Sequence, residues 1–449
     1  MTEDILQAVK ASGAGKVKLA VTDIDGVLRG KVIHEDKFAT ALESGFGFCN
    51  VIFGWDSADE CYDNADYTGW HTGYPDALAQ IDPLTFRKVP WEDDLPFFLA
   101  DFRNELGQPL AVCPRQLLKR IRERALAQGF SASFAQEFEW FNFRETPENL
   151  HDTQFANPTP LSRGMFGYSL LRAQENSEFF NALFDLLGAF RVPLEGLHTE
   201  TGPGVYEAAI LYDDVLEAAD RAVLFKGSVK EIAQKYGVIP SFMAKWNEQL
   251  PGCSGHLHQS LWREGRNLFH DPDAELGMSS LMQSYIAGLL HCLPHVLPMF
   301  APTINSFKRL VEGLWAPTTL TWAVDNRTVC VRALPGSAKA SRCELRVVGA
   351  DVNPYLAMAA SLASGLYGIS QGLTLEQAET KGNGYQDKSN GVLPANLWDA
   401  TQAMKQSDIA KELFGEEFVQ HFCATREWEW REYAKAVTDW ELRRYFEVI

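Results

Sequence analysis

The 449-residue chain lacks long apolar runs and an excess of basic residues, and each absence excludes a class of protein. No stretch approaches the roughly 18 consecutive apolar residues of a membrane-spanning helix. The first residues, Met1–Asp4, have neither the basic start nor the apolar stretch of a secretory signal peptide. The net charge of −18 disfavours non-specific binding to nucleic acid or to anionic membranes. We therefore expect a cytoplasmic protein with no nucleic-acid partner and no membrane partner.

Paired cysteines are also missing. The eight cysteines lie at positions 49, 61, 113, 253, 292, 330, 343 and 423, and no two form a Cys-x-x-Cys pair. This spacing gives neither a thiolate zinc motif nor a disulfide framework. We expect reduced thiols that pack mostly as small apolar groups.

Hydrophobic residues make up 46% of the chain, which is enough for a large core in more than one domain. Residues 1–105 are expected to form a small sheet-plus-helix domain, and residues 106–449 the larger remainder. Strands are predicted over 16–23, 27–33, 48–53, 81–87, 95–102, 131–143, 193–200, 205–211, 240–246 and 255–262. Helices are predicted over 37–44, 113–129, 176–187, 212–236, 278–297 and 353–368, with helical spacing over 408–449 and a polar loop over 372–394.

Acidic side chains recur inside apolar segments, where a hydrophobic core should not tolerate them. Glu137 and Glu139 lie two apart, so on a strand both point to one face. Glu200 and Glu207 flank a Gly-Pro-Gly turn that could bring them to one end of a sheet. Taken singly, the first pair fits a solvated strand face and the second a plain hairpin. Together they predict a cation, because a buried carboxylate costs several kcal/mol unless it is paired or binds a metal.

Two histidines and a fifth carboxylate extend this pattern. His256 and His258 follow Gly255 and are strand neighbours on one face, although a hydrogen-bonded core pair also explains them. Glu344 lies in Arg342-Cys-Glu-Leu-Arg346. Carboxylates combined with a histidine favour hard divalent ions such as Mg²⁺ or Mn²⁺. The segments together predict one polynuclear metal site.

Basic residues cluster around the last of these carboxylates. Arg342 and Arg346 alternate with Glu344, and Arg327, Arg332 and Lys339 lie upstream. A carboxylate among fixed cations suits the binding of ATP phosphates and of a substrate carboxylate, although surface ion pairs would give the same sequence. Cations beside a metal site favour phosphoryl transfer.

Two short motifs point elsewhere. Asp23-Ile-Asp25-Gly26 resembles the nucleophile motif of haloacid-dehalogenase-type phosphatases, but an Asp-Gly hairpin turn explains the same residues. A phosphatase would also leave the later segments without a role. Gly13-Ala-Gly-Lys16 resembles part of a P-loop, but Lys10 stands where the motif needs its first glycine.

Six segments, in this order, resemble the type I-like glutamine synthetase family over nearly the whole chain. They are 134–143, 198–207, 255–261, 302–311, 326–332 and 339–346, the last running on to Asn353-Pro-Tyr-Leu. Each motif alone is weak, but six in order are highly specific. Within the family, the chain resembles the γ-glutamylpolyamine and γ-glutamylmonoamine synthetases.

The resemblance implies two or three Mg²⁺ (or Mn²⁺) ions per active site. One ion would be held by Glu139, Glu200 and Glu207, and another by Glu137, His256 and Glu344. ATP would be a co-substrate that faces His258, Ser260, Arg332, Lys339 and Arg342. Arg309 and Arg346 would hold glutamate, and Arg327 would steady the transferred phosphoryl group.

The resemblance also implies an α+β fold and an assembly. Residues 1–105 would form an N-terminal β-grasp domain. Residues 106–449 would form a catalytic domain with a curved antiparallel sheet and flanking helices. Family members form ring-shaped homo-oligomers, commonly dodecamers of two stacked hexameric rings. Asp56, in Gly54-Trp-Asp-Ser57, falls near the family's neighbouring-subunit Asp that approaches the amine.

Two departures from the family pattern concern the substrate. Glutamine synthetases carry a flap Glu in Pro-Gly-Tyr-Glu-Ala-Pro, and here Trp315 stands in its place in Glu312–Pro317. Tryptophan offers no base and no charge for ammonium, but an aromatic face for an alkyl or aryl amine. The Asn-Gly pair that grips glutamate's amino end reads Pro251-Gly252, so only Gly252 remains at that subsite.

The sequence therefore predicts an ATP- and metal-dependent ligase that joins glutamate's γ-carboxylate to an amine through γ-glutamyl phosphate. Trp315 favours a hydrophobic monoamine over a polyamine. An ordinary glutamine synthetase that uses ammonium is the first alternative. An inactive structural member of the fold is the second, although every expected metal ligand is present.

Overall fold

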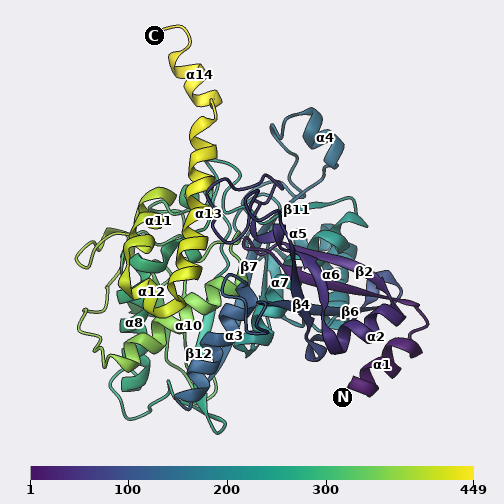
Figure 1. The fold of residues 1–449 in the computed structure, drawn as a ribbon. Helices are drawn as coiled ribbons and strands as arrows, with labels where there is room; N and C mark the ends of the chain where they lie inside the picture. Colours follow the sequence, from purple (N-terminus) through teal and green to yellow (C-terminus); the bar gives the residue numbers. More distant parts are fainter. Residues whose placement is uncertain (1) are drawn as a thin grey trace.

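The computed structural model describes residues 2–449, which form two β-sheets with separate hydrophobic cores (Figure 1). The first sheet has the order β2-β1-β6-β4-β3, with β5 paired to β6. Its strands are β1 (Lys16–Thr22), β2 (Leu28–His34), β3 (Phe46–Cys49), β4 (Asp76–Ile81), β5 (Arg87–Val89) and β6 (Leu95–Arg103). β1 and β6 are parallel, and the other pairs are antiparallel.

Helices α1 (Thr2–Ala11) and α2 (Glu35–Ser44) pack against each other, and α2 also contacts β1, β2 and β4. Phe38 of α2 is fully buried and lies 4.9 Å, between ring centroids, from Phe98 of β6. The buried apolar residues of this core run from Ile5 to Cys113. The β1–β2 turn carries the Asp23-Ile-Asp25-Gly26 motif, and Oδ1 of Asp23 accepts the backbone N–H groups of Asp25 and Val27. The motif is therefore a hairpin turn.

The second sheet crosses the larger part of the chain in the order β14-β15-β16-β12-β7-β9-β8. Its strands are β7 (Ser131–Phe143), β8 (Leu194–Thr199), β9 (Val205–Ile210), β12 (Leu257–Arg263), β14 (Trp322–Val324), β15 (Val331–Leu334) and β16 (Arg342–Leu345). Only β14 and β15 are parallel. The short strands β10 (Asp213–Asp214) and β11 (Ile239–Ser241) pair with β7, and β13 (Arg266–Asn267) pairs with β12.

Helices flank this sheet and complete its core (Figure 1). The longer ones are α3 (Pro114–Ala127), α6 (Ser177–Ala189), α7 (Val215–Gln234), α8 (Ser280–Val296), α10 (Pro354–Ser370), α11 (Leu397–Gln406) and α13 (Glu416–Lys435). The shorter ones are α4 (Pro147–Asp152), α5 (Leu170–Glu175), α9 (Ser306–Arg309), α12 (Asp408–Phe414) and α14 (Asp439–Tyr445). Helices α8 and α10 cross so closely that a Cβ on Gly368 would lie 2.1 Å from the Ser284 carbonyl oxygen.

A buried ion network joins the first sheet to helices of the larger part. Arg115 of α3 donates to both carboxylate oxygens of Asp220 on α7 at 2.8 Å, and to Asp101 of β6 at 2.7 Å. Asp82, which follows β4, lies 2.9 Å from the same guanidinium, and the Tyr355 hydroxyl of α10 donates to Asp220 at 2.6 Å. The N-terminal sheet is thus tied to three helices of the larger part.

The predicted α+β fold, with a curved sheet and flanking helices, is confirmed. Three predicted strands were wrong in detail, and one of them, 240–246, is only the three-residue β11 at Ile239–Ser241. The expected strand 81–87 is β4 at Asp76–Ile81, because Pro83 has no N–H for a ladder and starts a 3₁₀ turn capped by Asp82. The expected strand 48–53 stops at Cys49 and continues as a 3₁₀ helix. Among residues 2–449, no helix combines the length and apolar composition needed to cross a membrane.

Candidate active site

Strand β7 presents Glu137 and Glu139 to one face and Phe134, Phe138 and Trp140 to the other. Glu137 and Glu139 alternate with the fully buried Phe138 and Trp140. Phe138 stacks on Phe225 of α7 with ring centroids 5.6 Å apart. Packing of the aromatic face against α7 therefore fixes both glutamates on the opposite face, as the period of two predicted.

Neighbouring strands bring the other acidic and histidine residues into register with this face. Across β8 and β9, His198 lies opposite Glu207, and Glu207 in turn lies opposite Glu139 of β7. On the other side of β7, His258 of β12 lies opposite Glu344 of β16. Like charges directly opposite each other on a sheet are destabilising unless something neutralises them. The register therefore gathers residues that the sequence separates by more than 200 positions.

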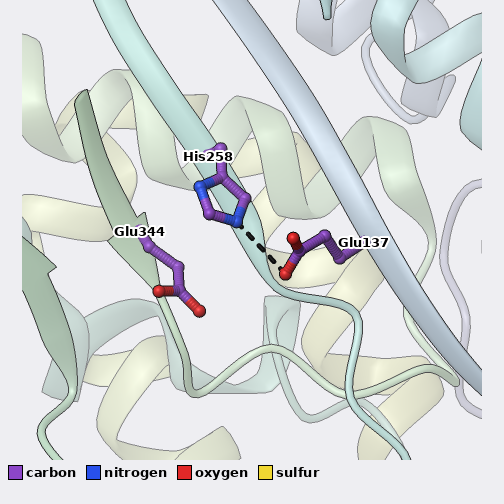
Figure 2. Close-up of side chains that lie close together, drawn as sticks. All are labelled: Glu137, His258 and Glu344. Carbon is purple, nitrogen blue, oxygen red and sulfur yellow. Dashed lines mark ion pairs between the residues drawn. The ribbon is translucent and has the colours of Figure 1, made fainter. Parts of the chain in front are cut away.

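Two groups of side chains in the described chain could each hold a metal ion. In the first, ligand atoms of Glu137, His258 and Glu344 all lie within 4.8 Å of one another (Figure 2). In the second, ligand atoms of His198, Glu200 and Glu207 meet the same limit. Figure 2 shows Glu137 and His258 directed toward each other from adjacent strands, with Glu344 beside them.

His256, predicted as a ligand with Glu137 and Glu344, lies beside both. Its Nδ1 atom is 3.3 Å from Glu344 Oε1 and 3.8 Å from Glu137 Oε2. Its Nε2 atom is buried and has no hydrogen-bond partner, and the same holds for Oε2 of Glu200. A divalent cation would satisfy the orphaned Glu200 oxygen, and an oxygen-rich donor set with histidine suits Mg²⁺ or Mn²⁺. The residues present therefore fit the metals that the family uses.

The two groups differ in their electrostatics. Burial and the carboxylates of Glu139, Glu137, Glu200 and Glu344 raise the pKa of Glu207 to about 10. Burial also raises the pKa of Glu344, but His256, Arg346 and His258 outweigh it and bring that pKa down to about 2. The group that contains Glu207 is therefore surrounded by other carboxylates, whereas the charge of the group that contains Glu344 is partly neutralised by protein cations.

A pocket of about 510 Å³ opens beside the carboxylates and contains most of the residues predicted to face the nucleotide. Those lining it are His258, Ser260, Lys339 and Arg342, together with Glu137, His198 and Glu207. Arg342 Nε donates to His258 Nδ1 at 3.1 Å, so the Nε2 atom of His258 faces Glu137 at 3.2 Å. Arg332 does not line the pocket but contacts Glu344 Oε2 at 3.0 Å from the next strand.

The residues predicted to hold glutamate form a separate buried cluster. Arg309 is 3% exposed and donates to the carbonyl oxygens of Val347 and Arg346. Arg346 pairs with Glu344, and its buried Nε atom has no partner. Gly252 lies against Arg309, since a Cβ there would meet Arg309 Cγ at 2.9 Å and the Ala244 carbonyl oxygen at 2.4 Å. Only glycine fits this position.

The remaining predicted residues lie on loops. Arg327 is exposed in the turn between β14 and β15. Trp315 is 56% exposed and has a positive φ of 63°, a conformation unusual for a bulky residue. Asp56 lies between β3 and β4, and its carboxylate contacts its own loop and Trp428 of α13. In residues 2–449, no hydrogen bond or ion pair joins Asp56 to the glutamates of β7.

Two residues at the site were missed from the sequence. His198 shares a strand face with Glu200, and its Nε2 atom lies 3.8 Å from Glu207 Oε2. The His-x-Glu spacing could have revealed it. Tyr168 stacks on His198 with ring centroids 4.5 Å apart, and burial and Glu200 raise the pKa of its hydroxyl. It comes from the long connection after β7, which carries no sequence signal for the site.

The chain was compared with known families and structures. Residues 111–445 match the family model for the catalytic domain of glutamine synthetase. A type-1 glutamine synthetase of Dictyostelium discoideum is 53% identical over 99% of this chain and 86% of its own length. A glutamate–isopropylamine ligase of a Pseudomonas species is 36% identical, over 96% of this chain and 95% of its own length.

Two further matches agree with these. A γ-glutamylethanolamide synthetase of Streptomyces coelicolor is 36% identical, over 99% of this chain and 95% of its own length. A solved structure described as a GmaS/ADP complex superposes with a TM-score of 0.86 at 27% identity and covers all of both chains. The family uses ATP and divalent metals, and its catalytic reaction forms a carbon–nitrogen bond. The chain belongs to the glutamine synthetase family.

Proposed function

We propose that this protein is an ATP-dependent ligase that joins the γ-carboxylate of glutamate to an amine. The observation that carries the proposal is the adjacency of three things. One metal-capable group, Glu137, His258 and Glu344, shares Glu137 and His258 with the cation-lined pocket, and Arg332 and Arg346 pair with its Glu344. Relatives named for isopropylamine and ethanolamine products support an organic amine as the nucleophile.

The first half of the reaction would activate glutamate. Arg309 and Arg346 would hold the acid at the Gly252 cluster, while His258, Ser260, Lys339, Arg342 and Arg332 would face the nucleotide. An oxygen of the γ-carboxylate attacks the γ-phosphorus of ATP, the bond to the β-phosphate oxygen breaks, and ADP leaves with that electron pair. Arg327 would steady the charge that spreads over the transferred phosphoryl group.

Metal chemistry would support this step. Glu139, Glu200 and Glu207 would hold one Mg²⁺ or Mn²⁺, and Glu137, His256 and Glu344 another, with His198 and His258 placed to assist. When bound, the two or three ions neutralise phosphate charge and order the γ-phosphate for in-line transfer. The unsatisfied Oε2 of Glu200 supports the first of these ligand sets, and the contacts of His256 Nδ1 with Glu137 and Glu344 support the second.

In the second half, the amine nitrogen attacks the acyl carbon, and the carbon–oxygen bond to phosphate breaks. Phosphate leaves, and the nitrogen loses a proton. Asp56, supplied by a neighbouring subunit, would attract the protonated amine and accept that proton. The exposed aromatic face of Trp315 favours a hydrophobic monoamine over a polyamine, because it adds apolar contact where a glutamate would add charge.

We also propose the domain division and assembly that the resemblance implied. A β-grasp domain over residues 1–105 and a catalytic domain over 106–449 are supported by an apolar cluster confined to residues 5–113, while Val89, Leu95, Phe97 and Leu99 of the first sheet pack into the larger cluster. A dodecamer of two hexameric rings is supported by the arm formed by α13 and α14, which extends from the body (Figure 1). Its end exposes Trp440, Phe446, Val448 and Ile449, at 55%, 80%, 76% and 95%, and such surfaces generally mark contacts.

The test is phosphate release from ATP and glutamate with ammonium, putrescine, spermidine, alkylamines and arylamines in the presence of Mg²⁺. We expect alkylamines or arylamines to stimulate release most strongly. Absence of stimulation by every amine and by ammonium would refute the ligase.

Glutamine synthesis from ammonium is the second candidate, favoured by the 53% identity to a protein named as a glutamine synthetase. The variant Trp315→Glu separates the two readings. If Trp315 selects the amine, the kcat/KM ratio for ammonium over alkylamine rises at least about tenfold, equivalent to about 1.4 kcal/mol. Trp398→Glu, at a 40% exposed tryptophan on α11, is the matched control and leaves the ratio unchanged. An unchanged ratio in Trp315→Glu would contradict the role of the flap.

A further inference from the structure

We propose that Trp428 on α13 is a positioning residue that fixes the carboxylate of Asp56 for the amine step. The inference rests on the proposed function, because it assigns Asp56 to the amine. It adds a residue from helix α13 that no site motif contains.

The two oxygens of the Asp56 carboxylate are held by different parts of the chain. Oδ1 accepts the backbone N–H groups of Ala58 at 2.8 Å and Glu60 at 3.0 Å, which closes a tight turn within the loop itself. Oδ2 accepts the indole N–H of Trp428 at 3.2 Å. The loop alone therefore fixes one oxygen, and Trp428 sets the rotation of the carboxylate about it.

The indole is itself held on several sides. The Tyr62 ring meets it edge-on with centroids 5.8 Å apart. The guanidinium of Arg431 lies 5.0 Å from the ring centroid, and Lys435 Nζ lies 6.0 Å from it. Cations over an indole face are attracted to its π electrons. The donor N–H consequently has a defined direction even though Trp428 is only half-buried.

Helix α13 is anchored near Trp428 by a buried arginine. Arg426 is 3% exposed, donates to the carbonyl oxygen of Pro302 at 2.7 Å and pairs with Asp25 at 2.6 Å. The loop after Asp56 is tied to the same helix, since Asn64 donates to the Ala424 carbonyl oxygen at 2.8 Å. On its other side, Arg29 of β2 pairs with Asp59 at 2.8 Å. These contacts fix the position of the Asp56 loop relative to helix α13.

The closing experiment is a double-mutant cycle with the substitutions Trp428→Phe and Asp56→Ala. Trp428→Phe keeps an aromatic ring for Tyr62 and Arg431 but removes the donor. We expect the KM for the amine to rise about tenfold, in line with losing one hydrogen bond to a charged acceptor. The KM values for ATP and glutamate should stay within about twofold. In the Asp56→Ala background, Trp428→Phe should add no further change, because the group it orients is gone.

Trp430→Phe is the matched control, since Trp430 lies on the same helix but packs on Trp398 and Tyr433. Positional isotope exchange in ATP with glutamate and no amine should be unaffected in every variant, because it reports acyl phosphate formation alone. An unchanged amine KM in Trp428→Phe would overturn the proposal. So would equal rises in all three KM values, or the same amine effect in the Asp56→Ala background.

The contact can also be checked without turnover. The ultraviolet resonance Raman band of the Trp428 indole N–H is obtained as the difference between the spectra of wild type and Trp428→Phe. In Asp56→Ala, this band should shift to the position of an indole without this acceptor. No shift would overturn the proposal. A wild type that releases no phosphate with any amine would instead refute the proposed function, and the Raman result would still decide whether Trp428 holds Asp56.

Discussion

Two of the proposed metal ligands should affect the metal-free protein in opposite directions when they are neutralised. Glu207 and Glu200 offer ligand oxygens no more than 4.8 Å apart. At an effective dielectric of about 20, two carboxylates at that distance repel by about 3.5 kcal/mol. Replacing Glu207 with Gln removes this repulsion, so we expect a gain of about 1–3 kcal/mol in the free energy of unfolding after discounting for partial exposure.

Glu344 is the opposite case, because its charge is neutralised by the protein. It is 1% exposed and contacts Arg332, Arg346 and His256. Glu344→Gln leaves two arginines facing a neutral amide in a buried setting. Breaking a buried ion pair by removing one partner typically costs about 3–5 kcal/mol, and we expect a loss of that size. Both substitutions should nevertheless weaken Mg²⁺ binding.

The assay is urea unfolding of chelator-treated protein, followed by tryptophan fluorescence, with and without added Mg²⁺. Glu195→Gln is the control, since Glu195 lines the same pocket but is exposed. The pH dependence gives a second check. The pKa of Glu207 in the folded chain, about 10, lies above its ordinary 4.5, so the metal-free wild type should lose stability as pH rises between them. Glu207→Gln should reduce that slope. Equal destabilisation by both substitutions, or full stabilisation of Glu207→Gln by Mg²⁺, would refute the reasoning.

Two further predictions concern stability. Arg115→Met should lower the free energy of unfolding by about 3–5 kcal/mol in urea titrations, because it leaves Asp220 buried with only Tyr355 as partner, and Arg124→Met is the control. Burial lowers the pKa of His421 to about 4, so its share of stability, present above pH 6.5, is lost as pH falls toward 4. His421→Phe should therefore flatten the acid limb of stability by about 3 kcal/mol, and an unchanged limb would contradict this.

The parts of the fold that the sequence predicted well are those with a clear period and clear ends. Residues 131–143 are β7 with the predicted bounds, because buried residues alternate with more exposed ones from Ser131 to Trp140. The predicted helix 113–129 is α3, with Pro114 in its first turn. Helix α11 was missed because Asn396 caps a segment beside a polar loop, and its apolar face is short. Local pattern does not reveal what a segment packs against.

The residues of the candidate site that lie on strands could be predicted from the sequence, but some of those on loops could not. Glu137, Glu139, His256 and His258 appear as residues two apart, which is the only spacing that a strand needs. Tyr168 reaches His198 from a connection that has no such constraint. The contact between Asp56 and Trp428 joins residues 372 positions apart, and although the family resemblance points to Asp56, nothing in the sequence points to Trp428. Only tertiary packing creates that pair.

The difference between strand residues and loop residues bears on which residues would select the amine in the proposed reaction. The proposed metal ligands lie on or beside strands of the second β-sheet. A change in the register of one strand would therefore displace several ligands at once. Trp315 and Asp56 lie on loops outside that sheet. Substitutions at either loop should therefore alter the proposed amine subsite while the carboxylates and the proposed nucleotide pocket stay in place. By this reasoning, relatives that differ in amine should differ first at these two loops and at the helix face that carries Trp428, and a chimera exchanging residues 312–317 should transfer amine preference without changing the KM for ATP.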